Sequence, residues 1–274
     1  MGSMEETTTG IVRLRAMEKE NKLRFPVVSI NDSDTKHLFD NRFGTGQSSL
    51  DGVIRATDIL IAGLRVGVIG FGDCGKGVAE RADGMGAQVY VVEIDSVRAL
   101  EAQMQGYSVV SAETLSKVAD LIITVTGNKH AISKDLFSSM KDGIILANAG
   151  HFDIEIDLEY LSKNSESVET VRENVQSYKF KGKEIFVIGE GRLVNLVAAK
   201  GHPASVMDMS FANQALAAKW IHDNQNKLKN KVYRLPKELD QEIAHKKLLL
   251  MGGELQALSE EQKEYLTSWE FGTS

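Results

Sequence analysis

A glycine-rich segment in the first third of the chain carries the clearest chemical signal. Between Val68 and Gly77 the sequence reads VIGFGDCGKG, so Gly70, Gly72 and Gly75 have the spacing G-x-G-x-x-G. The first glycine of such a loop allows a tight turn, the second lets a pyrophosphate approach the backbone, and the third lets the following helix pack on the preceding strand. The free N–H groups at the start of that helix bind phosphate oxygens. Because an apolar run precedes the loop and a helical pattern follows it, the segment predicts a dinucleotide site.

An acidic residue stands where the ribose of such a dinucleotide would lie. Glu93 ends the apolar run 88–92 and follows the glycine loop by about twenty residues. A carboxylate in this place accepts hydrogen bonds from the ribose hydroxyls and repels a 2′-phosphate. Taken alone, Glu93 would be interpreted as the solvated end of a strand. Together with the glycines, it predicts a site for NAD and not for NADP.

The elements around the loop follow from apolar runs that alternate with amphipathic segments from Arg65 onward. This alternation implies parallel strands joined by right-handed crossovers, and strands buried on both faces are continuously apolar, as these are. Helices are expected over 76–84 and 96–105. Strands are expected over 66–69, 88–92, 107–110, 121–125, 144–147 and 184–189. The fold class is therefore α/β, a Rossmann-type doubly wound parallel sheet with flanking and C-terminal helices.

Segments outside the sheet have weaker patterns. Residues 40–49 are polar and rich in glycine and are assigned to no element, and residues 150–174 are less regular. Further helices are expected over 5–24, where Pro26 stops the helix, and over 50–64, 205–224, 236–250 and 260–269.

Composition excludes several classes of protein. The 274 residues contain 32 Lys and Arg against 38 Asp and Glu, a net charge of −6. No window has the dense basic run that coats nucleic acid, and no apolar run approaches the about 20 residues that span a bilayer. The N-terminal residues lack the pattern of a signal peptide, and the single cysteine allows neither an internal disulfide nor a zinc site. We expect a cytoplasmic protein with a small-molecule substrate, no metal, no nucleic acid and no membrane.

Several short segments, among them EETTTG and GHFD, are together far more specific than the glycine loop. In order and spacing they resemble S-adenosylhomocysteine hydrolase from about Glu5 to the C-terminus. The segments are Glu5–Gly10, Asn31–Ser33, Thr35–Lys36, Phe39–Asn41, Asp51–Gly52, Arg55–Asp58, Ile61–Gly63, Gly150–Asp153, Gly189–Asn195 and Gly201–Pro203.

The resemblance implies a reversible hydrolase that converts S-adenosylhomocysteine to adenosine and homocysteine with tightly bound NAD⁺ and no net oxidation. The ribose 3′-hydroxyl is oxidised to a ketone, which acidifies the 4′ C–H. A base removes that proton, homocysteine leaves from C5′, water adds, and the ketone is reduced again. The ketone is needed because a thioether is a poor leaving group until a neighbouring carbanion is stabilised. Such an enzyme serves one-carbon metabolism, in the methyl cycle.

The resemblance also assigns roles to residues. Lys36 would be the base near the 3′ and 4′ positions, oriented by Asn41, whereas Asp40 would hold the ribose hydroxyls and Glu6 the adenine edge. Without the resemblance, Lys36 and Asp40 would pass for a surface pair. The implied catalytic set is Lys36, Asp40, Asn41 and His151, and the implied substrate-binding set is Glu6, Lys36, Asp40, His151 and His202.

The cofactor positions implied by the resemblance extend well beyond the glycine loop. Cys74 lies inside that loop, where a small residue suffices, so we assign it no chemistry of its own. The implied NAD-binding set is Thr7, Thr8, Thr9, Asn41, Gly70, Gly72, Asp73, Cys74, Gly75, Lys76, Gly77, Glu93, Arg98, Thr126, Gly127, Asn128, Ala149, Gly150, His151, Asn195 and His202.

The chain departs from the family at both ends. The family carries a substrate domain before the EETTTG segment, so we expect this chain to bind NAD and to be inactive alone. We divide it into residues 1–45, a residual segment of the substrate domain and hinge, 46–200, the NAD-binding Rossmann domain, and 201–274, C-terminal helices with a return hinge and an oligomerisation surface. We expect a homodimer or homotetramer. The ending, Trp269–Ser274, resembles short-tailed, archaeal-type members.

Three alternatives stay open at this stage. One is S-inosylhomocysteine hydrolase, since the family's adenine contacts come mostly from the substrate domain. Another is an NAD-dependent dehydrogenase of a hydroxy acid, which shares the glycine loop and the acidic ribose clamp but has no EETTTG segment. The third is a non-catalytic NAD-binding relative that acts through protein partners, although such relatives usually add a long Ser-rich N-terminal extension.

Overall fold

The main sheet of the protein is built as the apolar runs predict. The computed structural model of the chain describes residues 2–269, so residues 270–274 of the short ending lie outside the described residues. The sheet has eight strands. They are β3 (Arg65–Ile69), β4 (Gln88–Val92), β5 (Ser108–Val109), β6 (Leu121–Thr124), β7 (Ile144–Asn148), β8 (Ser167–Arg172), β9 (Val175–Phe180) and β10 (Lys183–Ile188).

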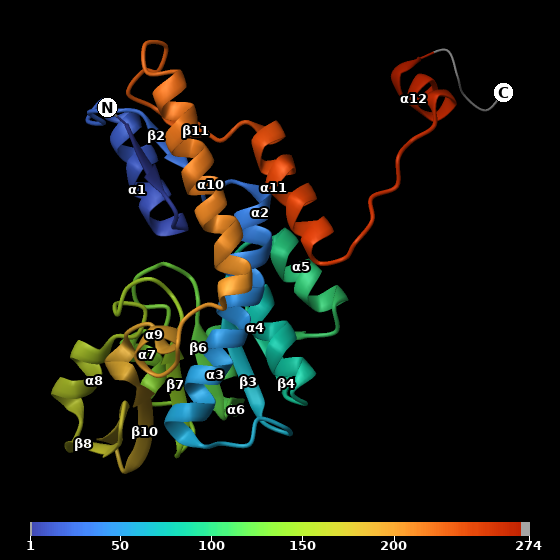
Figure 1. Cartoon of the computed structure of the whole chain (residues 1–274). Helices are drawn as coiled ribbons and strands as arrows, with labels where there is room; N and C mark the ends of the chain where they lie inside the picture. Colours follow the sequence, from blue (N-terminus) through green and yellow to red (C-terminus); the bar gives the residue numbers. More distant parts are fainter. Residues whose placement is uncertain (1, 270–274) are drawn as a thin grey trace.

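The strand order is β5-β4-β3-β6-β7-β10-β9-β8 (Figure 1). From β5 to β10 all neighbouring strands are parallel. The chain adds β4 and β5 on one side of β3 and then crosses over to add β6, β7 and β10 on the other side. This reversal is the switch point of a doubly wound sheet, and the order is that of the Rossmann fold. The predicted fold class is confirmed.

The sheet is not parallel throughout, which corrects the expectation. β8 and β9 form an antiparallel hairpin that continues onto β10. The segment 150–174, expected to be irregular, contains β8 and a short helix. β8 is an edge strand whose side chains are mostly exposed. An edge strand needs no continuous apolar run, so the polar sequence of β8 does not predict a strand.

Helices cover both faces of the sheet, and alternate residues of a strand point to opposite faces. The flanking helices are α3 (Thr45–Thr57), α4 (Asp73–Gly84), α5 (Ser96–Met104), α6 (Ala112–Val118), α7 (Lys134–Phe137), α8 (Leu158–Asn164) and α9 (Val194–Val197). Val66 and Val68 pack in the core with α3 and α4. Ile69 and Ile122 pack in a separate core with α6, α7 and α8. The sheet therefore lies between two apolar layers.

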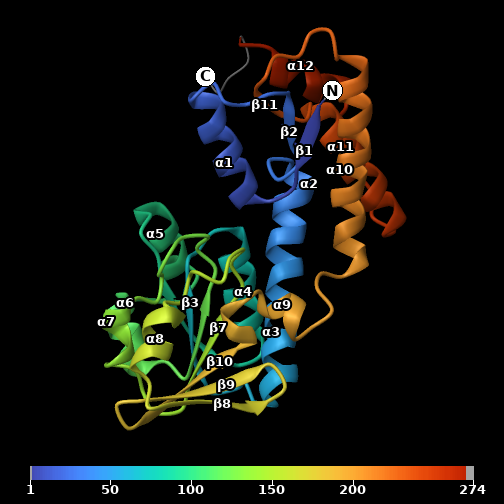
Figure 2. The same cartoon turned by 90° about the vertical axis from the view of Figure 1, so that its left-hand side faces the viewer.

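Segments from the beginning and the end of the sequence form a second, smaller unit. Its elements are β1 (Ser3–Glu5), α1 (Thr8–Lys19), β2 (Val27–Ser29), α10 (Ala204–Asp223), β11 (Val232–Arg234) and α11 (Lys237–Leu250). The last helix, α12 (Glu260–Thr267), has no buried residue and stands apart at the end of an extended segment (Figure 1). β2 pairs in parallel with both β1 and β11, so segments far apart in the sequence lie side by side (Figure 2). Strands of three residues are too short to show alternation, and the sequence analysis does not predict them.

The described residues contain no helix that is long and apolar enough to cross a membrane.

One long helical segment joins the two units (Figure 2). α2 (Asp34–Lys36) runs into a π-helix, η1 (His37–Gly44), and η1 runs into α3. Residues 40–49 are therefore helical, although their polar, glycine-rich sequence does not predict a helix. The polar residues of this segment, such as Asp40 and Thr45, are buried.

Two helix boundaries also differ from the prediction. The helix expected over 50–64 begins at Thr45 and ends at Thr57, because Asp58 takes a left-handed conformation with φ 58°. The helix expected over 5–24 is shorter and ends at Lys19, well before Pro26. The three late helices are confirmed as α10, α11 and α12.

Candidate functional site

The carboxyl ends of the parallel strands meet at one edge of the main sheet, and the second unit faces this edge. The guanidinium of Arg13, on α1, lies 4.6 Å from the ring centroid of Phe152, in the loop after β7. A Cβ added to Gly127, in the loop after β6, would lie 3.6 Å from the hydroxyl of Thr9. Ligands of doubly wound sheets bind at this edge, at the switch point.

The glycine loop after β3 has the shape that its sequence predicts. Gly70 has φ +102°, a conformation that other residues rarely adopt. A Cβ on Gly75 would lie 1.9 Å from the carbonyl oxygen of Gly70, so only glycine fits there. Gly72, the N-cap of α4, has open space beside it, because the nearest atom to its added Cβ is a guanidinium nitrogen of Arg98 at 3.8 Å. The loop thus forms an open cradle at a helix N-terminus, with a cation beside it.

Glu93 is fixed beside this cradle by backbone hydrogen bonds. Its carboxylate accepts from the N–H groups of Phe71 at 2.7 Å, Ile94 at 2.7 Å and Asp95 at 3.0 Å. The carboxylate is therefore held at the end of β4, where an acidic residue meets a ribose. Lys76, in contrast, forms an ion pair with Glu101 at 2.8 Å.

The loop after β6 is held by one buried carboxylate. Glu155 is 0% exposed and accepts hydrogen bonds from the N–H of Thr126 at 2.9 Å, its hydroxyl at 2.8 Å and the N–H of Gly127 at 2.7 Å. Burial raises the pKa of Glu155, and the hydrogen bonds from Thr126 and Gly127 oppose that rise. The Thr126 hydroxyl accepts in turn from the N–H of Asn128 at 3.0 Å. These bonds fix the backbone that lies against Gly70.

The loop after β7 is organised by Asn148, the last residue of that strand. Its side-chain oxygen accepts from the N–H of Gly150 at 2.7 Å, and its side-chain nitrogen donates to the carbonyls of Phe152 at 2.8 Å and Gly191 at 2.8 Å. Ala149 is buried, whereas the His151 side chain is exposed at the edge of the site and packs edge-on against Phe152 at 4.5 Å.

The start of α1 completes the rim opposite the loops. Thr7 is the N-cap, and its hydroxyl accepts from the N–H of Gly10 at 3.0 Å. Thr8 is exposed, and Thr9 lies toward Gly127 as described above. Glu6 accepts a hydrogen bond at 2.6 Å from Gln214 on α10, so its carboxylate points to that helix.

A buried cluster around Lys36 lies where the helical segment meets the sheet. The Lys36 ammonium donates to the side-chain oxygen of Asn41 at 2.6 Å and to that of Asn31 at 3.4 Å, and lies 3.2 Å from a carboxylate oxygen of Asp40. Asn41 also donates to Asn31 at 3.0 Å. Lys36 is only 4% exposed, so Lys36 and Asp40 form a buried ion pair and not the surface pair that they would suggest without the resemblance.

Asp40 links this cluster to the glycine loop. Its second oxygen lies 2.7 Å from Nδ1 of His202, whose Nε2 lies 3.3 Å from the hydroxyl of Thr45. That hydroxyl lies 3.5 Å from the sulfur of Cys74, inside the loop. Burial raises the pKa of Asp40, but the hydrogen bond from His202 and the charges of His202 and Lys36 outweigh it, so the pKa lies below its ordinary value. Burial raises the pKa of the Cys74 thiol, which agrees with its having no chemical role.

Replacing Asp40 with asparagine is expected to lower the free energy of unfolding at pH 7 by about 2 kcal/mol, because the charged hydrogen bonds are lost. The depressed pKa of Asp40 adds a pH dependence. The carboxylate stabilises the fold fully above the unfolded-state pKa of about 3.9, and this contribution is lost as the pH falls through the lower folded-state pKa. Acid-induced loss of stability should therefore be shallower in Asp40→Asn than in wild type, as urea titrations between neutral and acid pH would measure.

The matched control is Asp51→Asn, on the same helical segment. Asp51 pairs with Arg55 at 2.8 Å on the exposed surface, so its loss should change the free energy of unfolding by about 0.5 kcal/mol or less. If the free energy of unfolding fell equally steeply with acid pH in wild type and in Asp40→Asn, the assigned role of the His202 and Lys36 contacts would be contradicted.

Asn195 gives an independent test of whether a cofactor fits this site. It is 4% exposed, and its side-chain oxygen has no hydrogen-bond partner among residues 2–269. A buried acceptor without a donor is costly, so native proteins rarely keep one. An amide group on a bound dinucleotide would satisfy it. The unpartnered oxygen of Asn195, the open cradle at Gly72 and the fixed carboxylate of Glu93 together show that the residues present fit a dinucleotide.

Most residues predicted for the site lie around this one edge of the sheet. Within the described part of the chain, no group of three or more His, Cys, Asp or Glu side chains is placed to hold a metal. Two predicted residues point elsewhere, since Glu6 faces Gln214 and Lys76 faces Glu101.

The sequence analysis missed four residues that organise the site: Asn31, Thr45, Asn148 and Glu155. Asn31 belongs to a segment that carried the resemblance, so a signal was present for it. Glu155 stands three residues after Phe152 in an irregular segment, and nothing in its sequence context distinguishes it from an exposed glutamate. Only the fold reveals that it is buried.

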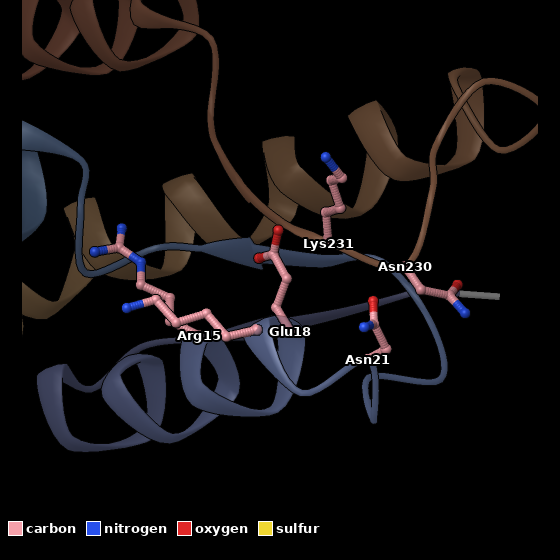
Figure 3. A pocket seen from close by; sticks show the side chains of 6 residues that line it. Arg15, Glu18, Asn21, Asn230 and Lys231 are labelled. Carbon is pink, nitrogen blue, oxygen red and sulfur yellow. The ribbon is translucent and has the colours of Figure 1, made fainter.

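A separate polar cleft lies on the second unit, between α1 and the segment before β11 (Figure 3). Its volume is about 450 Å³. Glu18 is engaged there by the N–H of Val232 at 2.8 Å. The cleft is lined by Arg15, Glu18, Lys19, Asn21, Asn230 and Lys231. None of the predicted site residues lines it, so we do not place the site there.

Six parallel strands in this order, with a glycine loop after the first and a fixed acidic residue after the second, define a Rossmann-type dinucleotide-binding protein. The buried Lys36 cluster against the same edge is not part of that general fold. Residues 41–201 match the family described as "S-adenosyl-L-homocysteine hydrolase, NAD binding domain". The chain belongs to the S-adenosylhomocysteine hydrolase family and carries its NAD-binding domain.

Individual relatives agree with this assignment. The chain is 56% identical over 272 residues to adenosylhomocysteinase of Archaeoglobus fulgidus, a match that covers 99% of this chain and 67% of the relative. It is 55% identical over 273 residues to S-inosyl-L-homocysteine hydrolase of Methanocaldococcus jannaschii, covering 100% of this chain and 66% of the relative. The chain thus spans about two thirds of the length of the curated relatives that it matches. The family assignment removes the hydroxy-acid dehydrogenase alternative.

Among solved structures, the dipicolinate synthase A chain from Bacillus subtilis superposes with a TM-score of 0.54 at 19% identity, covering 83% of this chain and 66% of that one. At this identity the likeness concerns the fold alone.

Proposed function

We propose that this chain is the cofactor-binding part of an NAD-dependent hydrolase that cleaves the thioether of S-adenosylhomocysteine or of its inosyl analogue. The observation that carries the proposal is the buried Lys36–Asp40–Asn41 cluster, joined through His202 and Thr45 to the glycine loop. A base beside a nicotinamide site is what proton removal next to a transient ketone requires.

In this proposal the glycine loop and the start of α4 bind the pyrophosphate, and Glu93 binds the adenosine ribose. Thr9, Gly127 and Asn195 lie toward the nicotinamide end. When bound, NAD supplies a reversible hydride acceptor. The chain contributes the fixed polar groups around it, which need no reorganisation during the reaction.

Lys36 would hold or accept a proton at Nζ. Asn41 and Asn31 offer it side-chain oxygens, and Asp40 lies 3.2 Å away, so the amine is fixed in one orientation. Asp40 is itself fixed by His202. His151 is exposed at the rim and would meet a substrate that enters from outside. Catalysis by such a cluster depends on this orientation more than on any single charge.

The remaining features of the whole protein are part of the same proposal. Residues 1–45 and 201–274 would belong to the hinge, residual substrate domain and assembly surface, and 46–200 to the NAD-binding domain. We propose a cytoplasmic homodimer or homotetramer that serves the methyl cycle. Because the chain spans about two thirds of the length of its relatives, we expect it to bind NAD without hydrolysing substrate alone.

Purified chain should therefore release close to one equivalent of NAD on denaturation, with no hydrolysis of either thioether. Adding the third of a relative that this chain does not cover should restore hydrolysis, and supplying the adenosyl and inosyl substrates separately would distinguish the two activities. Glu93→Ala should lose the bound NAD, whereas Glu113→Ala, an exposed glutamate paired with Lys117, should keep it. Absence of NAD from the wild-type chain would refute the proposal, and NAD binding without restored turnover would favour a non-catalytic relative.

A further inference from the structure

The helical turn that carries Lys36 has no cap from its own residues. Ser33 is in the N-cap position of α2 but makes no side-chain cap hydrogen bond, and its hydroxyl has no partner within residues 2–269. The first N–H groups of a helix need acceptors, which the N-cap side chain usually supplies. The acceptors for this turn must therefore come from elsewhere.

They come from Asp240, on α11, more than 200 residues further along the chain. Its carboxylate accepts from the N–H of Asp34 at 2.6 Å and from the N–H of Thr35 at 3.2 Å, and it also accepts from the Thr35 hydroxyl. Asp240 is 6% exposed and has no ion-pair partner in the described part of the chain. Its charge is thus satisfied by this one turn alone.

Asn213, on α10, fixes the direction of these bonds. Its side-chain nitrogen donates to the Thr35 hydroxyl oxygen at 2.7 Å and to the Met209 carbonyl at 2.9 Å. Because a hydroxyl has a single hydrogen and its oxygen already accepts from Asn213, that hydrogen goes to Asp240. Thr35 is therefore held by α10 and α11 at once.

We propose that Asp240 is a positioning residue for Lys36, which acts through Thr35 and the capped turn. Lys36 directly follows Thr35, and its own N–H bonds the carbonyl of Ser33 at 3.0 Å, so its backbone is set by this turn. The ammonium then reaches Asn41 at 2.6 Å. The role of Lys36 as a base rests on the proposed function, whereas its positioning by Asp240 can be measured without turnover.

The test compares Asp240→Asn with wild type in the complete chain. Asparagine keeps the shape but places an NH₂ group against backbone donors, so exchange of the Asp34 and Thr35 amides should become about tenfold faster. Acylation of the Lys36 amine, measured relative to the exposed Lys163, should rise several-fold. Thr35→Val should reproduce part of both changes, and Thr35→Ser, which keeps the hydroxyl, should not.

The matched control is Glu242→Gln, which removes one charge from the exposed face of the same helix, where Glu242 pairs with Lys246. Both readouts should stay at wild-type values in that variant. Unchanged exchange and unchanged Lys36 acylation in Asp240→Asn would overturn the proposal. So would a loosening that spreads equally to the strands of the main sheet, because Asp240 would then be a general stability residue. Neither readout needs NAD or substrate, so failure of the proposed function would be seen separately.

Discussion

Gly75→Ala is expected to weaken NAD binding and to lower the free energy of unfolding by about 3 kcal/mol. The added Cβ would lie 1.9 Å from the Gly70 carbonyl oxygen and 2.8 Å from its carbon, both backbone atoms that cannot rotate away. Helix α4 must move away from β3, and its first N–H groups move with it. Since a hydrogen bond to a charged group contributes about 1.5–3 kcal/mol, misplacing one or two of them should lower NAD affinity at least about tenfold.

Gly84→Ala, at the other end of α4, is the control for this substitution. An added Cβ at Gly84 meets no atom within 4 Å. Alanine in a helix is more favourable than glycine by about 0.5–1 kcal/mol, so this variant should be as stable as wild type or slightly more stable. Denaturant titration and calorimetry with NAD would measure both variants. Wild-type NAD affinity in Gly75→Ala would mean that the loop does not hold the pyrophosphate.

The parts of the site that the sequence predicts are those whose chemistry is local. The glycine loop needs no distant partner to be recognised, because the positive φ of Gly70 and the close approach of Gly75 to the Gly70 carbonyl both arise within a few residues. The parallel strands are recognised for a similar reason, since burial on both faces leaves a continuous apolar run. Glu93 follows from the same local unit, and its carboxylate bonds the N–H of Phe71 inside the loop.

The parts that the sequence alone does not predict depend on contacts between distant segments. Residues 40–49 have a polar, glycine-rich sequence that does not predict a buried helix. Their polar side chains become buried only because His202 and the glycine loop pack against them. The cap that Asp240 gives to α2 is another such case, as it joins opposite ends of the chain. Local pattern cannot tell a buried, paired polar residue from an exposed one.

Glu155→Ala is expected to lower the free energy of unfolding by about 3 kcal/mol, because two N–H groups and a hydroxyl lose the carboxylate that accepts their hydrogen bonds. The loop over 125–128 should become mobile, and NAD affinity should fall about tenfold because Gly127 and its neighbours no longer have one conformation. Glu159→Ala is the control, since Glu159 is exposed and bonds only Lys163 at 2.6 Å among the described contacts of its side chain.

A second substitution distinguishes this account from a general loss of stability. A Cβ on Gly150 would lie 1.6 Å from a carboxylate oxygen of Glu155, so Gly150→Ala should be strongly destabilising by itself. Glu155→Ala removes the atoms that this Cβ would strike, and the nearest remaining one is the Asn148 side-chain oxygen at 3.1 Å. The double variant should therefore lose less than the sum of the single losses, by about 1 kcal/mol or more. Strict additivity would mean that Glu155 does not connect the loops after β6 and β7, and that the two loops are held independently.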